Sequence, residues 1–276
     1  MHLIMILTAL TVAWCLRASV TDFQGSWSVR WRRSLFLFLF PPLLIFMTAI
    51  AVLCMGPQGN MGGMYTGWFS YVLTLIFIAI VDILCIKLAF GGWQSVKSVR
   101  NCPLVNLEGK QMRLLSTEAL FAGQIGFWHS ELVISQGLLK TLSPEHLETV
   151  FAHEQGHYHY KDTFWFFWLG WVRSCTAWLP NTDALWQELL ILRELRADAY
   201  AALRVDPLLL AESLLLVVST TPISSEIFCA ALGSDRLEQR IEALLAQPEP
   251  TPELNFQFWN GFLLAFLPLV SVIFHN

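Results

Sequence analysis

The run HEQGH at residues 153–157 has the spacing of two metal ligands with an acid between them. On a helix, residues four apart lie on one face, so the rings of His153 and His157 can reach the same metal ion. Glu154 is then carried beside the water that the metal activates, where it can accept a proton. If the run is helical, this spacing predicts a zinc site with hydrolytic chemistry.

A second run, ELRAD at residues 194–198, supplies a third ligand and a supporting acid. Glu194 would complete a set of three protein ligands, and three ligands leave one zinc position open, as in catalytic sites. Asp198 can accept a hydrogen bond from the second ring nitrogen of a ligand histidine, which fixes the orientation of that ring. By itself this run equally fits a solvated helix face, and its presence after HEQGH favours the metal site.

Both runs lie in segments that are predicted to be helical. Ser143 is a suitable N-cap, and Pro144 a suitable first residue, for the helix that carries the histidines. Asn181 or Thr182 can cap the second helix. Apolar residues follow each start at spacings of three and four, namely Leu147, Val150 and Phe151 in the first segment and Leu185, Leu189, Leu192, Leu195 and Ala199 in the second.

The two motifs resemble those of integral-membrane zinc metallopeptidases of the gluzincin type, which include the HtpX and CAAX-protease group and the BlaR/MecR antirepressor peptidases. The matching runs are HEQGHYHYKD at 153–162 and RELRADAYA at 193–201. The later run SDRLEQRIEALL at 234–245 is similar to a segment that follows the third ligand in those proteins. The run FAGQIGFWHSELVISQGLL at 121–139 is similar to the strand pair that precedes their catalytic helix.

The resemblance implies the same roles as the spacing. His153, His157 and Glu194 would bind Zn²⁺, Glu154 would be the general base, and Asp198 would support a ligand histidine. The resemblance covers the catalytic segment and the arrangement of membrane segments around it.

One feature departs from the pattern of HtpX-type enzymes. These enzymes commonly have a histidine near the segment matched here by residues 230–240, where it can stabilise the tetrahedral intermediate, whereas this chain has no histidine between His159 and His275. Another residue must then donate to the oxyanion. The candidates are Tyr200, Arg204, Arg236 and Arg240.

The composition is that of a membrane protein. Hydrophobic residues make up 55% of the chain and charged residues only 14%, against about 25% charged residues in soluble domains. We predict about four transmembrane helices, at residues 1–16, 35–55, 71–90 and 256–274. The first is interpreted as a retained helix rather than a cleaved signal peptide, because no basic residue precedes it. Asp82, near the end of the third, is interpreted as hydrated or locally paired.

Basic residues predict the orientation in the membrane. They lie between the first two apolar runs and after the third, while the Gly-rich loop 56–67 carries no charge. By the positive-inside rule, the chain is a multi-pass protein of the cell (inner) membrane whose active site faces the cytoplasm. The net charge of −4 argues against nucleic-acid binding. The basic residues in question are Arg17, Arg30, Arg32 and Arg33, then Lys87, Lys97, Arg100, Lys110 and Arg113.

The sequence predicts a mainly α membrane protein with three parts. Residues 1–98 form a three-span membrane unit, 99–246 a helical zinc-peptidase unit, and 247–276 a Pro-rich linker with a C-terminal transmembrane helix. Between the third and fourth spans, the peptidase unit is expected to carry a small β-strand pair, at 113–121 and 131–136. The second strand could form an exposed edge beside the zinc, where a substrate peptide adds as a further strand.

The tryptophan-rich segment 163–179 looks at first like a further transmembrane helix. If it crossed the bilayer, however, His157 and Glu194 would face opposite sides of about 30 Å of hydrocarbon, and one zinc ion requires both within about 2.2 Å. We therefore predict that the segment extends the catalytic helix, lies along or dips into the membrane face, and turns back at residues 180–181.

These observations predict a zinc-dependent endopeptidase that acts on protein or peptide substrates at the membrane. A regulatory peptidase that cleaves a repressor, like the BlaR/MecR proteins, is an alternative role. A non-enzymatic multispan protein such as a transporter is a second alternative, but a transporter places its ionisable groups near mid-membrane. Here they cluster in the polar unit. Substrate identity and oligomeric state are left open.

Overall fold

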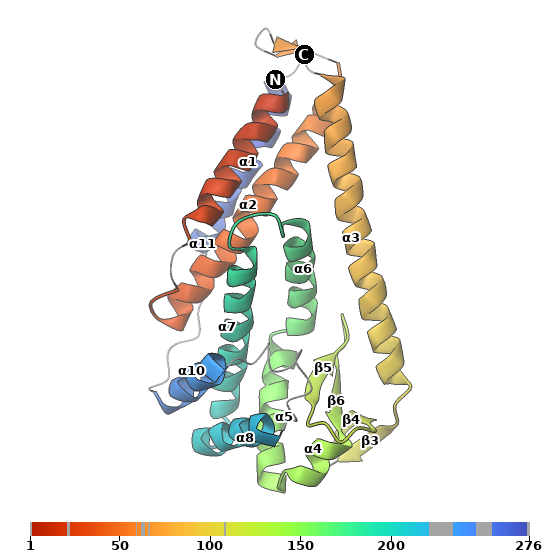
Figure 1. Ribbon diagram of the computed structural model, residues 1–276, viewed down its shortest axis with the longest axis vertical. Coiled ribbons are helices and arrows are strands. Elements are labelled where there is room, and N and C mark those ends of the chain that lie inside the picture. The colour runs from red at the N-terminus through yellow and green to blue at the C-terminus, as the bar shows by residue number, and fades with distance from the viewer. Residues whose placement is uncertain are drawn as a thin grey trace. The chain divides into compact units, whose positions relative to one another are not determined.

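The computed structural model is mainly helical and describes residues 2–20, 23–58, 60–61, 64–65, 67–107, 109–220, 234–246 and 256–274 (Figure 1). It divides into two compact units. The first comprises Met1–Leu88, Leu169–Leu190 and Thr251–Asn276, and the second Ala89–Trp168 and Ile191–Pro250. The predicted linker from residue 247 to 255 lies outside the described residues, and the predicted domain boundaries stay a prediction.

The first unit consists of helices and one two-stranded hairpin. Its elements are α1 (His2–Ala18), α2 (Trp27–Met55), β1 (Asn60–Met61), β2 (Met64–Tyr65), most of α3 (Trp68–Arg100), the end of α6 (Asp162–Cys175), the start of α7 (Thr182–Ala202), α11 (Phe256–Leu263), the 3₁₀ turn η1 (Leu264–Phe266), α12 (Leu267–Val270) and the 3₁₀ turn η2 (Ser271–Phe274).

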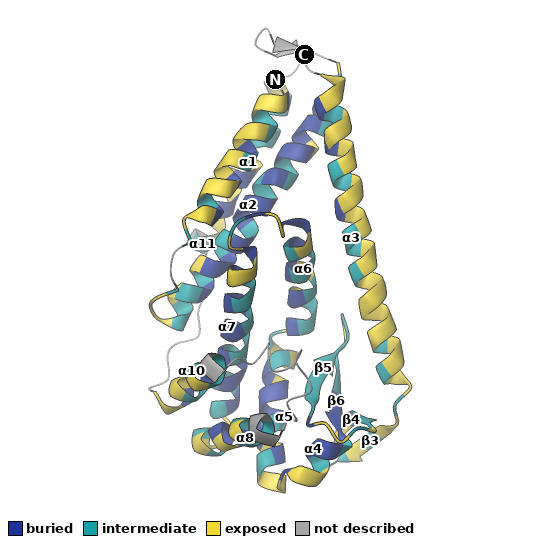
Figure 2. Cartoon of the chain, in the orientation of Figure 1, coloured by how far each residue is buried: buried dark blue, intermediate teal, exposed yellow. Residues whose placement is uncertain are grey.

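Two of these helices, α2 and α3, are long and apolar enough to cross a membrane. They contain the predicted spans 35–55 and 71–90, and they suggest membrane association. In Figure 2 the outer surface of α3 is exposed along most of its length. The predicted span 1–16 falls in α1, which has only 17 residues, and the four-span arrangement remains a prediction.

The C-terminal apolar run 256–274 differs from the expected single helix. It is divided into α11, η1, α12 and η2. Pro268 gives a physical reason, because it has no backbone N–H to donate to the carbonyl of Leu264 and its ring is crowded by that carbonyl. The helix therefore changes to 3₁₀ geometry at residues 264–266, directly before Leu267 and Pro268.

The segment between α6 and α7 reverses the chain inside the first unit. Leu179 packs with Ala13 of α1 and Ile45 of α2. The guanidinium of the buried Arg17 donates to Thr182 Oγ1 at 3.2 Å, and Asn181 Nδ2 donates to the carbonyl of Arg17 at 2.9 Å. The chain thus turns back at residues 180–181, as the site chemistry predicted.

The expected continuity of α6 with the catalytic helix is wrong. The helix α5 ends at His159 and α6 begins at Asp162, with a turn at Tyr160 and Lys161 between them. Lys161 has φ of +53°, a left-handed conformation that ends one helix before the next begins.

The second unit combines a small mixed sheet with the helices of the candidate site. The sheet order is β3-β4-β6-β5, with β4 and β6 parallel and the other pairs antiparallel. The elements that this unit adds are β3 (Leu104–Leu107), β4 (Lys110–Leu115), β5 (Ala122–Ile125), β6 (Glu131–Ser135), α4 (Gln136–Thr141), α5 (Pro144–His159), α8 (Pro207–Thr220) and α10 (Ser234–Leu245).

The sheet corrects the predicted strand pair. Only residues 113–115 of the expected strand 113–121 are in a strand, and β3 was not predicted. Both β5 and β6 lie within 121–139, the run that resembles a strand pair of the metallopeptidases. The expected strand 131–136 corresponds to β6, but β6 lies between β4 and β5, so the edge strand next to it is β5. With four residues including a glycine, β5 is too short to show an alternating pattern.

Two apolar cores hold the second unit together. One lies between the sheet, α4 and the first half of α5, and the other joins α5, α7, α8 and α10. The first contains Met112, Leu120, Ile134, Leu138, Leu142, Leu147 and Phe151, and the second Ala152, Ala201, Leu210, Ala211 and Leu244.

Candidate metal centre

The helix α5 begins as the sequence predicts. Ser143 is its N-cap, with Oγ accepting from the backbone N–H of His146, and Pro144 is its first residue. Apolar residues of its first turns enter the core against the sheet. This anchoring fixes which face of α5 the two histidines occupy.

Gly156 allows α5 and α7 to approach closely. A Cβ atom at this position would lie 3.0 Å from the Cα and 3.1 Å from the carbonyl oxygen of Ala197, closer than ordinary packing allows. Ala197 itself is fully buried. The close approach brings the two motifs together, since Gly156 lies within HEQGH and Ala197 within ELRAD.

Three candidate donor atoms form a small triangle. His153 Nε2 and His157 Nε2 are 3.1 Å apart, and Glu194 Oε2 lies 3.4 Å from the first and 3.7 Å from the second. Donor atoms of a tetrahedral zinc ion, each about 2.0–2.2 Å from the metal, lie roughly 3.3–3.6 Å from one another. The residues present therefore fit a zinc ion.

A carboxylate lies behind each histidine. His157 Nδ1 is hydrogen-bonded to Asp162 Oδ2 at 2.7 Å, and His153 Nδ1 lies 2.8 Å from Asp198 Oδ1. The second contact has the distance of an ion pair without the alignment of a good hydrogen bond. Each carboxylate favours a proton on Nδ1, which leaves Nε2 with its lone pair. Two lone pairs 3.1 Å apart repel each other unless a cation lies between them.

An arginine in turn contacts each of the three carboxylates of Asp198, Asp162 and Glu194. Arg240 on α10 binds Asp198 through two nitrogens, at 2.7 and 2.8 Å. Arg196 on α7 donates to Asp162, and Arg193 donates to Glu194 Oε1 at 2.7 Å through Nη2. These charged contacts fix the orientation of carboxylates that would otherwise be buried without partners.

The electrostatics of the centre favour a cation. Burial lowers the pKa of both histidines, but the neighbouring acids outweigh it. The pKa of His153 is raised, chiefly by Asp198, and that of His157 is raised to about 10, chiefly by Glu194 and Asp162. Burial raises the pKa of Asp198 and Glu194, yet the arginines and histidines bring both below their ordinary values. The acids that raise the pKa of both rings would equally stabilise a metal cation between them.

Glu154 has the environment expected of a proton acceptor. Its side chain is buried, and Oε2 has no hydrogen-bond partner among the residues that the structure describes. The backbone carbonyl of Glu154 accepts a bond from Gln124 Nε2 of β5 at 3.3 Å. A buried carboxylate oxygen without a protein partner needs a water or substrate group to satisfy it.

Sequence reasoning missed some residues of the centre. Asp162, Arg193 and Arg196 were not predicted, although Asp162 lies only five residues after His157 and a turn between them would have indicated it. Arg240 was considered as an oxyanion donor, but two of its nitrogens bind Asp198 and the third, Nη1, lies 3.5 Å from Glu194.

The remaining oxyanion candidates lie in different surroundings. The guanidinium carbon of Arg204 lies over the ring of Tyr200, 3.6 Å from its centroid, and Arg204 Nη1 donates to the carbonyl of Tyr200. The donor to the oxyanion stays a prediction among Tyr200, Arg204, Arg236 and Arg240.

Comparison with known protein families adds an independent observation. The model of peptidase family M48 matches residues 105–188. Peptidases of this family are zinc-dependent, and the match supports a zinc metallopeptidase of family M48. The matched segment contains HEQGH and ends before Glu194, so the third donor rests on the geometry alone. Comparison with curated proteins and with solved structures found no match.

Proposed function

We propose that this chain is a membrane-bound zinc endopeptidase that hydrolyses peptide bonds of membrane or membrane-proximal proteins. The observation that carries the proposal is the donor triangle of His153, His157 and Glu194, whose spacing fits zinc. Glu154 lies on the helix that carries the two histidines. The match to a peptidase family supports the reaction class.

The proposed mechanism assigns a task to each residue. Zinc, when bound, supplies Lewis-acid activation of water and of the scissile carbonyl. His153, His157 and Glu194 hold the metal, and Asp198 and Asp162 keep the two rings in the ligating orientation. Glu154 accepts the proton of the attacking water and later delivers it to the leaving amine.

The substrate backbone is proposed to pair with β5. Among the residues that the structure describes, this strand pairs only with β6, and Gln124 of β5 contacts the backbone of Glu154. A peptide in extended conformation can add to such an edge through main-chain hydrogen bonds. This pairing would place a peptide bond of the substrate beside α5, and it would depend little on the side chains of the substrate.

We place the protein in the cell inner membrane as a multi-pass protein whose catalytic unit faces the cytoplasm. The apolar helices α2 and α3 support membrane attachment, and the distribution of basic residues supports the orientation. In this position the enzyme would act on damaged membrane proteins. Cleavage of a repressor remains the alternative role.

Metal analysis of the detergent-purified full chain tests the proposal. The wild-type protein should contain about one zinc per chain, and His153→Ala, His157→Ala and Glu194→Ala should each lose most of it, because two ligands cannot close the site. Glu148→Ala is a matched control, since this exposed glutamate lies on the same helix away from the triangle. Full zinc retention by Glu194→Ala would remove that residue from the ligand set.

A further inference from the structure

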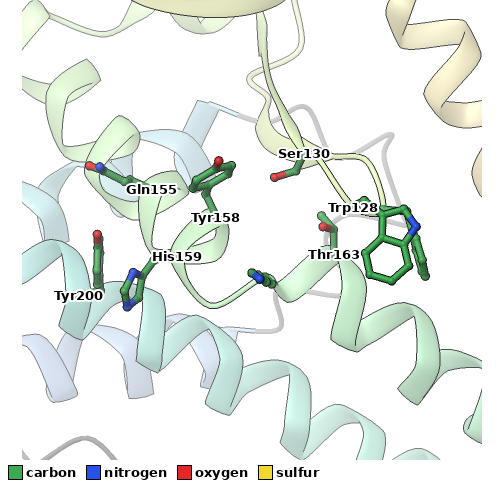
Figure 3. A pocket seen from close by; sticks show the side chains of 9 residues that line it. Trp128, Ser130, Gln155, Tyr158, His159, Thr163 and Tyr200 are labelled. Carbon is green, nitrogen blue, oxygen red and sulfur yellow. The ribbon is translucent and has the colours of Figure 1, made fainter.

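A pocket of about 310 Å³ lies on the second unit beside the catalytic helix. The turn after β5 contributes Phe127, Trp128 and Ser130, and α5 contributes Gln155 and Tyr158. Figure 3 shows Trp128 and Thr163 on one side of this space and Tyr200, His159 and Gln155 on the other. Its volume is at the lower end of the range for ligand pockets, roughly 300–1,000 Å³.

One wall of the pocket is aromatic and fixed by neighbouring rings. The Phe127 ring lies 5.0 Å from those of Trp128, Phe164 and Phe167, and Trp128 also packs on Phe164 at 5.0 Å. Trp128 nevertheless keeps 75% of its surface exposed. A tryptophan that is held by its neighbours and still faces solvent is available to a ligand.

The opposite wall is also aromatic and supported from behind. The ring of His159 stacks on that of Tyr200 with centroids 4.9 Å apart and planes 26° from parallel. Tyr160 packs edge-on against both rings, and Arg204 lies over Tyr200. Both walls are therefore formed before a ligand arrives, so that binding costs little side-chain ordering.

The charge of the lining selects against cations. Of the residues that the structure describes, Lys161 lines the pocket, and no aspartate or glutamate does. The ammonium of Lys161 has no acidic partner among the residues that the structure describes. A lysine or arginine side chain would therefore meet a like charge here, while an aromatic ring would meet other rings at favourable spacing.

Along the chain, the pocket residues follow directly after the proposed peptide-binding edge. The residues after Ile125 at the end of β5 turn directly into its aromatic wall. At this turn Gly126 has φ of +144°, and a Cβ there would lie 2.3 Å from the carbonyl of His129. On α5, Gln155 and Tyr158 of the lining adjoin Glu154 and His157 in sequence.

We propose that this pocket binds an aromatic side chain of the substrate and sets the position of the cut. The proposal rests on the proposed peptidase function and adds a preference to it. A peptide paired with β5 would place one aromatic residue between the walls of Trp128 and Tyr200. The distance between that residue and the cleaved bond would then be fixed by the strand.

Cleavage of a matched peptide set tests this preference. The peptides share one Gly- and Ser-rich sequence and carry phenylalanine, leucine, alanine or lysine at a single position, and product masses locate each cut. The phenylalanine peptide should be cut at a constant distance from its ring, with kcat/KM at least about tenfold above the alanine peptide. The lysine peptide should be the poorest. Equal rates for all four peptides, or cuts unrelated to the ring, would overturn the proposal.

Variants of the lining residues test whether the preference for an aromatic side chain arises from the pocket. Trp128→Ala and Tyr158→Ala should each reduce the ratio of the phenylalanine to the alanine rate by about tenfold. Trp93→Ala removes another solvent-exposed tryptophan that does not line the pocket, and it should leave the ratio unchanged. Equal loss for both peptides in the pocket variants would leave the ratio unchanged and would overturn the proposal.

A binding assay separates failure of the pocket from failure of the peptidase function. Fluorescein-labelled versions of the same peptides are titrated with the Glu154→Gln protein, and anisotropy reports binding without turnover. Tighter binding of the phenylalanine peptide, lost in Trp128→Ala, would support the pocket even if no cleavage were found. Cleavage without any difference in binding would keep the peptidase function and remove the pocket.

Discussion

At the residue scale, the centre is built in layers of alternating charge. The two histidines face one another, a carboxylate lies behind each, and an arginine holds each carboxylate. Such an arrangement sets the protonation and direction of both rings without contact with the metal itself. Substitution of one of these outer residues can therefore test the centre while the three metal ligands stay unchanged.

Replacing the supporting acids should weaken zinc binding without abolishing it. In Asp162→Asn and Asp198→Asn, the ring nitrogen loses a charged acceptor, and zinc affinity should fall roughly 10–100-fold, as measured by chelator competition. Asp183→Asn changes an exposed carboxylate outside the centre and should have no effect. Unchanged affinity in both buried-site variants would contradict the supporting role.

Zinc affinity should rise with pH. Although burial lowers the pKa of His157, the acids around it raise it to about 10, so at lower pH the metal-free site carries a proton that zinc must displace. Between pH 6 and pH 8, affinity should therefore increase by up to about tenfold per pH unit for each displaced proton. Chelator competition at each pH measures this slope. A flat or falling affinity across that window would contradict the proton-bearing site.

The sequence predicted the inner part of the centre better than the outer part. The four-residue spacing of His153 and His157, and of Glu194 and Asp198, follows from helix geometry alone. Asp162 could not be found in this way, because it comes after a turn whose shape depends on the left-handed conformation of Lys161. The role of Arg240 depends on the position of another helix, which a single sequence does not determine.

At the element scale, the contact between α5 and α7 determines whether the two motifs meet. Gly156 and Ala197 form the closest part of that contact. A larger residue at position 156 must push against backbone atoms, which cannot rotate away as a side chain can. The positions of the three donor atoms therefore depend on a glycine that is not itself a metal ligand.

Substitution of Gly156 should disturb the metal centre, although Gly156 is not a ligand. Gly156→Ala forces a shift of a few tenths of an ångström between the helices, and zinc affinity and hydrolysis should fall together, hydrolysis by about tenfold or more. Gly170→Ala is the matched control, because a Cβ there meets its nearest neighbour at an ordinary 3.9 Å. Wild-type zinc affinity in Gly156→Ala would show that α5 and α7 can accommodate a methyl group at this contact without moving the ligands.

Helices were predicted more reliably than strands for a physical reason. The start of α5 at Pro144 has a local signal in its cap, and both motif helices have apolar residues at regular spacings. The sheet depends instead on pairing between segments that are apart in the sequence. A strand of four residues with glycine, such as β5, carries little local information, so the edge was assigned to β6 by mistake.

At the scale of the whole molecule, the hairpin formed by α6 and α7 connects the candidate metal ligands of the second unit to the helices of the first unit along the chain. Its turn belongs to the first unit with α1 and α2, and its other ends belong to the second. The sequence predicted this reversal only because both motifs must share one metal ion. Hydropathy alone would have made 163–179 another span, and it did not reveal the break at Pro268.

Cysteine labelling should show that the hairpin does not cross the membrane. Lys161→Cys and Trp178→Cys place exposed reporters before and after α6. In intact cells neither should react with an impermeant thiol reagent, whereas Asn60→Cys, in the loop predicted to face outward, should react. After permeabilisation Lys161→Cys should become reactive. Reaction of Trp178→Cys from outside would mean that α6 spans the bilayer.

The most direct test of the central claim is the hydrolysis rate of the zinc-loaded Glu154→Gln protein, with zinc content measured in the same sample. Glutamine preserves the shape of the buried side chain and cannot accept the proton of the attacking water. We expect about one zinc per chain, as in the wild type, together with a loss of hydrolysis of about 10²–10⁴-fold. Hydrolysis within a few-fold of the wild-type rate at full zinc content would contradict it.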